Sequence, residues 1–222
     1  MDLPVLSALM ILSSLLCCAS LYVCCRFVAY ERIDMSHSLW GIACIAASIF
    51  PLASNYPQAH SDIIIISNTM YVLGHYLFVV GTMRIYIKKP SFQGVLRLLL
   101  VMSALGGFLS LNMKDTAWCF VLNRNAFIFL SFLVLYYLLL KSPSFAKCKL
   151  NILFMGLLTI YITHSAFRVF SCLFYSEKSD FIRGKALYEY EFKVLAAFLF
   201  ISSFYMMLYS YQRAKDSYNK SL

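Results

Sequence analysis

Charged residues are scarce in this sequence. Asp, Glu, Lys and Arg together make up 13% of the 222 residues, whereas a soluble domain of this length carries about 25%. Acidic residues are the scarcest, with 10 Asp and Glu against 19 Lys and Arg. A water-exposed surface cannot be built from so few charges. The composition therefore excludes a soluble domain, and we expect lipid to surround most of the protein.

Motifs for catalysis and metal binding are absent as well. The sequence holds no G-x-S-x-G, H-E-x-x-H or P-loop motif, and no pair of carboxylates lies within an apolar run. Of the eight cysteines, none forms a C-x-x-C pair with a matching second pair, as a zinc site would require. We therefore expect no enzyme activity, no cofactor and no metal, and we expect most cysteines to be small packing residues.

Apolar sequence is abundant, with 61% hydrophobic residues and a mean hydropathy of +0.74. Seven apolar stretches are each long enough to cross about 30 Å of hydrocarbon. They lie near 3–25, 37–55, 63–83, 95–112, 118–140, 150–175 and 191–212. The sequence thus predicts an all-α, polytopic membrane protein. Its seven-transmembrane-helix bundle occupies 1–212, and a cytoplasmic helical stub occupies 213–222.

Basic residues are distributed unevenly between alternate loops. One set of loops holds Arg26, Arg32, Arg84, Lys88, Lys89, Arg97, Lys141, Lys147, Lys149, Arg213, Lys215 and Lys220. The opposite set holds only Lys114, Lys178, Arg183, Lys185 and Lys193. Because basic loops stay in the cytoplasm, we predict the N-terminus outside and the C-terminus inside. The net charge of +9 then belongs to loops that meet lipid headgroups, so the expected partner is the lipid bilayer and no nucleic acid is expected.

Six polar side chains recur at similar depth in three of the predicted helices, in the half nearer the outside. Such residues normally face the bundle interior or a water-filled cavity, because exposing an arginine to lipid is costly. We predict an outward-facing polar pocket with a basic floor, suited to a small anionic ligand. Its predicted lining is Asn68, His75, Arg124, Asn125, His164 and Arg168.

Two other interpretations of these residues stay open. In the first, Arg124 and Arg168 pair with Glu189, Glu191 or backbone carbonyls and only tie the helices together. In the second, His75 and His164 hold haem or a metal, although two histidines alone are a weak signal for such a site.

Three of the apolar stretches carry a family resemblance. The second reads SHSLWGIACIAASIFPLASNYP, with Trp40 at its start, and the last reads AAFLFISSFYMMLYSYQRAKDSY and ends in the polar stub. The third reads IIISNTMYVLGHYLFVVGTMRIYI and contains Asn68, Gly74, Gly81 and Arg84. In this arrangement the chain resembles the seven-helix sensor region that precedes the catalytic domain of many bacterial diguanylate cyclases.

The resemblance implies a sensory, signal-input module, multi-pass in the bacterial inner membrane, that acts on a cytoplasmic signalling partner through the stub. In that family the stub leads into a GGDEF domain. No GG[DE]EF motif occurs in these 222 residues, so we expect the input half alone and no cyclase activity. A homodimer is a further expectation. The alternative is a small membrane transporter or carrier, which the chain length suits, but such carriers show a three-helix repeat that we do not find.

The last apolar stretch makes a local prediction of its own. Residues from Leu208 to Asn219 contain neither Pro nor Gly, so we expect the last helix to continue through them without a break. The segment before this helix, from Ser176 to Tyr190, is expected to be the longest outer loop.

Overall fold

The computed structural model describes residues 35–55, 61–87, 91–110, 116–142, 150–174 and 185–221, with Phe145 and the isolated residues 12, 14, 15, 18 and 19. These ranges contain helices and no strand. The helices are α2 (Met35–Asn55), α3 (Ser61–Tyr86), α4 (Ser91–Ser110), α5 (Thr116–Leu140), α7 (Leu150–Phe174) and α9 (Lys185–Ser221). Each predicted stretch from 37 onwards overlaps one of them. The first stretch, 3–25, lies outside the described residues apart from the isolated positions.

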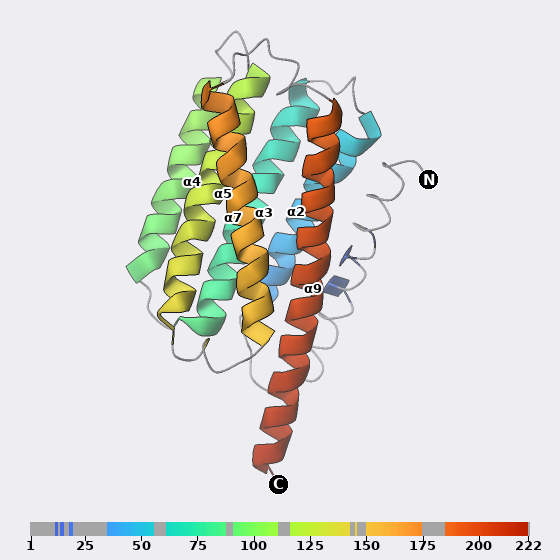
Figure 1. The fold of residues 1–222 in the computed structure, drawn as a ribbon, viewed down its shortest axis with the longest axis vertical. Helices are drawn as coiled ribbons and strands as arrows, with labels where there is room; N and C mark the ends of the chain where they lie inside the picture. Colours follow the sequence, from blue (N-terminus) through green and yellow to red (C-terminus); the bar gives the residue numbers. More distant parts are fainter. Residues whose placement is uncertain are drawn as a thin grey trace.

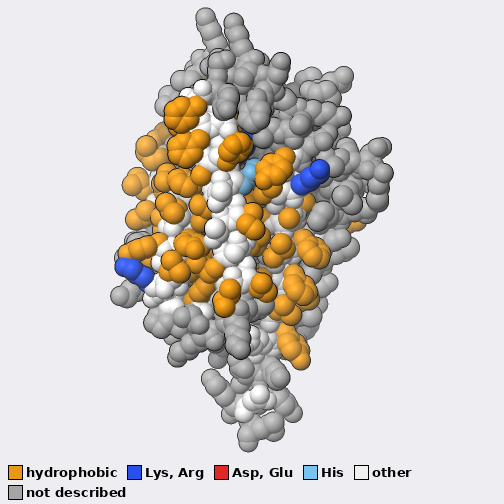
Figure 2. Space-filling view, in the orientation of Figure 1, with side chains coloured by type: hydrophobic (Ala, Val, Ile, Leu, Met, Phe, Trp, Pro, Cys, Tyr) orange, Lys and Arg blue, Asp and Glu red, His pale blue; other side chains and the backbone are white. Residues whose placement is uncertain are grey.

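Three of these helices are long and apolar enough to cross a membrane. Their apolar segments are Ile65–Tyr86, Val121–Leu140 and Asn151–Phe174. Shorter apolar segments lie in α4 (Gln93–Phe108) and α9 (Lys193–Tyr209). Figure 2 shows apolar side chains spread over one face of the molecule, with few Lys and Arg side chains among the described residues of that face. An all-helical protein with such an exterior is suited to a lipid surrounding.

Successive described helices run in opposite directions (Figure 1). α2 packs most extensively against α3, and α5 contacts α3, α4 and α7. α9 contacts both α7 and α2. We call the end where α3, α5 and α9 begin the upper end, as it is drawn in Figure 1. The alternating direction brings residues that are far apart in the sequence to the same level of the bundle.

α9 is the longest of the described helices, with 37 residues, and its lower part extends beyond the others (Figure 1). It continues through Ser221, so the prediction of an unbroken helix from Leu208 to Asn219 is confirmed. The predicted loop from Ser176 to Tyr190 was too long, because α9 already begins at Lys185. Ala, Leu and Glu follow that lysine, and their helix propensity outweighs the charge that suggested a loop.

Aromatic rings fill the centre of the bundle. Phe132 on α5 lies 6.0 Å from the ring of Phe78 on α3 and 5.7 Å from the ring of Phe198 on α9. Phe78 and Phe198 meet edge to face at 5.4 Å, and all three are fully buried. Contacts of this geometry contribute about 0.5–1.5 kcal/mol each beyond the buried area. This aromatic layer therefore fixes three helices against one another at mid-height.

Two glycines allow α2 and α3 to approach at backbone distance. A Cβ atom at Gly41 would lie 2.6 Å from the carbonyl oxygen of Gly74 and 2.5 Å from the amide nitrogen of Phe78. A Cβ atom at Gly74 would lie 2.7 Å from Cγ1 of Ile45. Membrane helices associate through small residues in this way, because close approach increases van der Waals contact. The contact leaves no room for a side chain at either position.

We expect Gly74→Ala to lower the free energy of unfolding by about 1–3 kcal/mol, because the added methyl group overpacks the contact between α2 and α3. Gly94→Ala on α4 is the matched control, since a Cβ atom there meets nothing within 4 Å. It should leave stability unchanged or raise it by about 0.5–1 kcal/mol through helix propensity. Denaturant unfolding in detergent, followed by circular dichroism, measures both. Equal stability of the two variants would contradict the close packing.

Candidate functional site

All six polar residues of the predicted pocket lie inside the bundle, and none is more than 9% exposed. They are Asn68, His75, Arg124, Asn125, His164 and Arg168. Arg168, at 1% exposed, is among the largest fully buried side chains of the described residues. The cost of placing such groups in hydrocarbon explains why they point inward. Their role in ligand binding stays a prediction.

His75 on α3 lies at the centre of a hydrogen-bonded group. Its Nδ1 is 2.7 Å from the backbone oxygen of Tyr71, and its Nε2 is 2.7 Å from the hydroxyl of Tyr161 on α7. A carbonyl oxygen can only accept, so Nδ1 carries a proton and donates it. In the neutral imidazole, Nε2 then accepts from Tyr161, whose oxygen accepts in turn from the Tyr71 hydroxyl at 2.9 Å. The hydrogen bonds thus close a directed ring through two helices.

This ring bears on the interpretation in which His75 holds haem or a metal. Both ring nitrogens of His75 already make hydrogen bonds to protein groups. The imidazole also stacks at 5.7 Å on the ring of Tyr161 and meets the ring of Phe132 edge-on at 5.7 Å. An iron or metal ion would have to displace one of the two partners and open this packing, so the geometry disfavours that interpretation.

Arg124 on α5 joins the same group from above. Its Nη1 donates to Oδ1 of Asn68 at 3.3 Å, and its guanidinium carbon lies 4.9 Å from the centre of the Tyr71 ring. A guanidinium over a tyrosine face is a favourable cation–π arrangement. We call Asn68, Tyr71, His75, Arg124 and Tyr161 the upper cluster; it connects α3, α5 and α7. The side chains of Glu189 and Glu191, the alternative partners, lie outside the described residues.

The backbone positions of Arg168 and Arg124 lie at the same level of the bundle. The rings of Phe132 and Tyr161 are 5.3 Å apart and mark one level on α5 and α7. Arg124 lies eight residues above Phe132, which is about 12 Å along the helix, and Arg168 lies seven residues above Tyr161, which is about 10.5 Å. Two arginines that are almost fully buried therefore stand on facing helices at a common height.

The other two predicted residues are placed differently. The ring of His164 lies 6.5 Å from that of Tyr161 and 5.6 Å from that of Tyr190 on α9, at the edge of the upper cluster. Asn125 turns back on its own helix, where Nδ2 donates to the carbonyl of Val121 at 2.8 Å. Its neighbour Asn123 instead donates to the carbonyl of Ser103 on α4 at 2.7 Å.

Sequence reasoning did not assign Tyr71 to the site, although its spacing carried a signal. Tyr71 lies three residues after Asn68 and four before His75, so the three side chains share one face of α3. Tyr161 lay on the same stripe of α7 as His164, but its hydroxyl contact with His75 was not anticipated. A tyrosine suits many depths of an apolar helix, so its type alone gives no indication of a polar contact.

A second polar group lies below the aromatic layer and was not anticipated. Oδ1 of Asn151 on α7 accepts from the hydroxyls of Tyr205 on α9 at 2.6 Å and of Tyr86 on α3 at 3.4 Å, and these hydroxyls also contact each other. Nδ2 of Asn151 donates to the carbonyl of Phe145. The hydroxyl of Ser142 donates to the carbonyl of Tyr86 at 3.0 Å. We call these five residues the lower cluster.

No protein-family model, curated protein or solved structure matches this chain. What the protein does must therefore be inferred from the geometry of its two clusters and of the helices that hold them.

We expect Tyr161→Phe to lower the free energy of unfolding by about 1–3 kcal/mol, because it leaves a buried ring nitrogen of His75 without a hydrogen-bond donor. A double-mutant cycle with His75→Phe should give a coupling of about 1 kcal/mol or more, since the two residues are in direct contact. Tyr211→Phe, at a tyrosine that is 70% exposed, is the control. If Tyr161→Phe is no more harmful than the control, the hydrogen-bonded ring does not stabilise the fold.

Proposed function

We propose that this protein is the signal-input module of a bacterial inner-membrane signalling system. In this proposal it is a seven-helix bundle with its N-terminus outside and its C-terminus in the cytoplasm. The upper cluster responds to a small anionic ligand, and α9 carries the response to a cytoplasmic partner. The observation that carries the proposal is the position of α9, which packs into the core of the bundle and also extends well beyond it (Figure 1).

α9 contacts the bundle at two levels through aromatic side chains. The ring of Phe198 stacks on that of Tyr161 with centres 4.1 Å apart, and Phe198 is fully buried. Tyr205, seven residues further on, donates to Asn151 in the lower cluster. Seven residues place the two contacts about 10.5 Å apart on one helix face. A shift of Tyr161 would therefore displace α9 directly, and the lower cluster would either resist the shift or follow it.

The proposed ligand class follows from the charge of the upper end. Arg124 and Arg168 are buried at a common height on α5 and α7. Guanidinium groups bind carboxylates and phosphates through paired hydrogen bonds, and low polarity of the surroundings strengthens that attraction. An anion between these arginines would compete with Asn68 for Arg124. It would thereby disturb the cluster that contains Tyr71 and His75.

The resemblance to the sensor regions of diguanylate cyclases supports the same function. Gly74 of the third predicted stretch, one of the residues that carry the resemblance, lies in the backbone contact between α2 and α3. The stub of the last stretch is the end of α9. For such a module to signal, the bundle needs two arrangements that the ligand binds with different affinity.

The proposed topology predicts the outcome of reporter fusions. Fusions after Lys89, after Lys149 and after Leu222 should all report the cytoplasm, because the loops near these positions carry most of the basic residues. A fusion after Ser61 should report the outside and serves as the internal contrast. A C-terminal fusion that reports the outside would overturn the orientation and, with it, the route through α9.

The proposed output predicts a dependence on helical phase. A diguanylate cyclase catalytic domain is fused after Leu222, and one to four residues that continue the helix are inserted at Ser217. If α9 is a rigid transmitter, cyclic-di-GMP synthesis should rise and fall with the period of about 3.6 residues per turn. The control carries the same insertions in a flexible Gly/Ser linker after Leu222 and should show no such period. Activity that is indifferent to insertion length at both positions would leave α9 as a passive anchor.

A further inference from the structure

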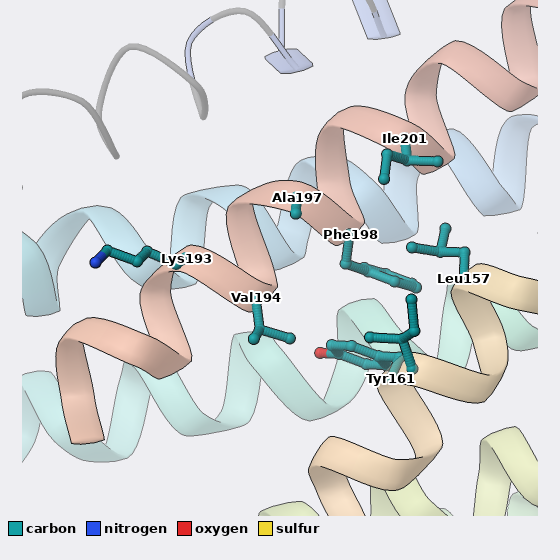
Figure 3. Close-up of a pocket in the computed structure, with 8 residues that line it drawn as sticks. Leu157, Tyr161, Lys193, Val194, Ala197, Phe198 and Ile201 are labelled. Atoms are coloured by element: carbon teal, nitrogen blue, oxygen red, sulfur yellow. The ribbon is translucent and has the colours of Figure 1, made fainter. Parts of the chain in front are cut away.

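A crevice of about 240 Å³ lies between α7 and α9 (Figure 3). Its floor is formed by Leu157, Tyr161 and Phe198, which are all buried. Its rim is formed by Ile160 on α7, 63% exposed, and Ile201 on α9, 41% exposed. The crevice is therefore open on the outer surface of the bundle and reaches down to the aromatic core.

The lining is apolar except at one end. Between Lys193 and Ile201, the lining residues of α9 lie on one helix face and cover about 12 Å along the axis. Lys193 stands at the upper end of this face, where the apolar segment of α9 begins. In Figure 3 its side chain extends away from the apolar residues, toward the start of α9. Among the described residues that line it, the crevice is thus apolar along its length and has one exposed cation, Lys193, at its upper end.

We propose that this crevice binds an anionic phospholipid from the surrounding bilayer. One acyl chain lies between Ile160 and Ile201 over the floor of the crevice, and the headgroup phosphate contacts Lys193. An apolar crevice of this kind holds no groups that would retain water, whereas a hydrocarbon chain fills it with favourable contacts. A lysine at the end of an apolar segment extends toward the headgroups, where it attracts negative charge. The proposal does not depend on the signalling function.

The site is connected to the upper cluster through its floor. Tyr161 presents its ring to the crevice and its hydroxyl to His75. Phe198 stacks on that ring at 4.1 Å and is itself part of the crevice floor. A chain in the crevice therefore packs against the residues that connect α7 to α9.

Native mass spectrometry of the detergent-purified full chain, incubated with equal amounts of phosphatidylglycerol and phosphatidylcholine, tests the proposal. The wild-type protein should retain one phosphatidylglycerol in preference to phosphatidylcholine, and the adduct mass identifies the lipid. Ala197→Trp fills the crevice and should remove this adduct. Lys193→Gln should reduce the preference for phosphatidylglycerol about fivefold, which is the effect expected of one basic residue at an anionic surface.

Matched controls carry the same substitutions elsewhere on the lipid-facing surface. Ala104→Trp and Arg97→Gln alter exposed residues of α4 and should leave the adduct unchanged. Ile201→Ala removes part of the rim without adding bulk and should weaken retention even if Ala197→Trp fails to fold. The proposal is overturned if the rim and filling variants retain the lipid as the wild type does, or if Lys193→Gln keeps the full preference. It is also overturned if the wild type is a dimer that Ala197→Trp dissociates, because a second copy then occupies the crevice.

Discussion

Hydrocarbon offers no hydrogen bonds, and the polar side chains of the upper and lower clusters bond to one another and to the backbone inside the bundle. His75 is the clearest case. It is fully buried at the middle of α3, and its two nitrogens reach partners on its own helix and on α7. Loss of either partner would leave a polar atom without compensation, so the positions of α3 and α7 are coupled. The aromatic layer then adds α9 to the same assembly, through Phe198.

The second cluster gives this arrangement a lower fixed level. Asn151 accepts from tyrosines on two other helices, so α3, α7 and α9 are joined a second time below Phe132. Between the two levels the contacts are aromatic pairs in stacked and edge-to-face arrangements, which such rings prefer. α9 is therefore held at two levels, at Phe198 and at Tyr205. α3 and α7 are held at the same two levels, through His75 and Tyr161 above and through Tyr86 and Asn151 below, so the three helices are coupled on both sides of the aromatic layer.

The burial of the six polar residues could be anticipated from the sequence, because the cost of exposing an arginine or histidine to lipid leaves little choice of direction. The hydrogen-bonding partners of these residues could not be anticipated from the sequence. Asn125 is adjacent to Arg124 and also polar, yet its side chain donates to the carbonyl of Val121 on its own helix, and residue type alone does not indicate this partner. Asn151 stands at the start of an apolar helix, where nothing in the sequence suggests that two tyrosines from distant segments converge on it. The extent of the helices was predictable where apolar residues continue, as along α3 and α5. It was not predictable at the start of α9, where helix-forming residues are also charged.

The length of α9 has a mechanical consequence. Its 37 residues extend about 55 Å, which exceeds the roughly 30 Å of a hydrocarbon layer by about 25 Å. If such a helix tilts as a rigid body inside the bundle, the displacement of its backbone grows with distance along the part that extends beyond the bundle. Ser221 lies 23 residues beyond Phe198, which is about 35 Å along the helix, so a tilt of about 5° at the aromatic layer would move it by roughly 3 Å. This displacement is comparable to the helix shifts that switch other proteins between states. A rearrangement near Tyr161 that is smaller than a hydrogen-bond length would thus produce a larger displacement of Ser221 relative to its surroundings.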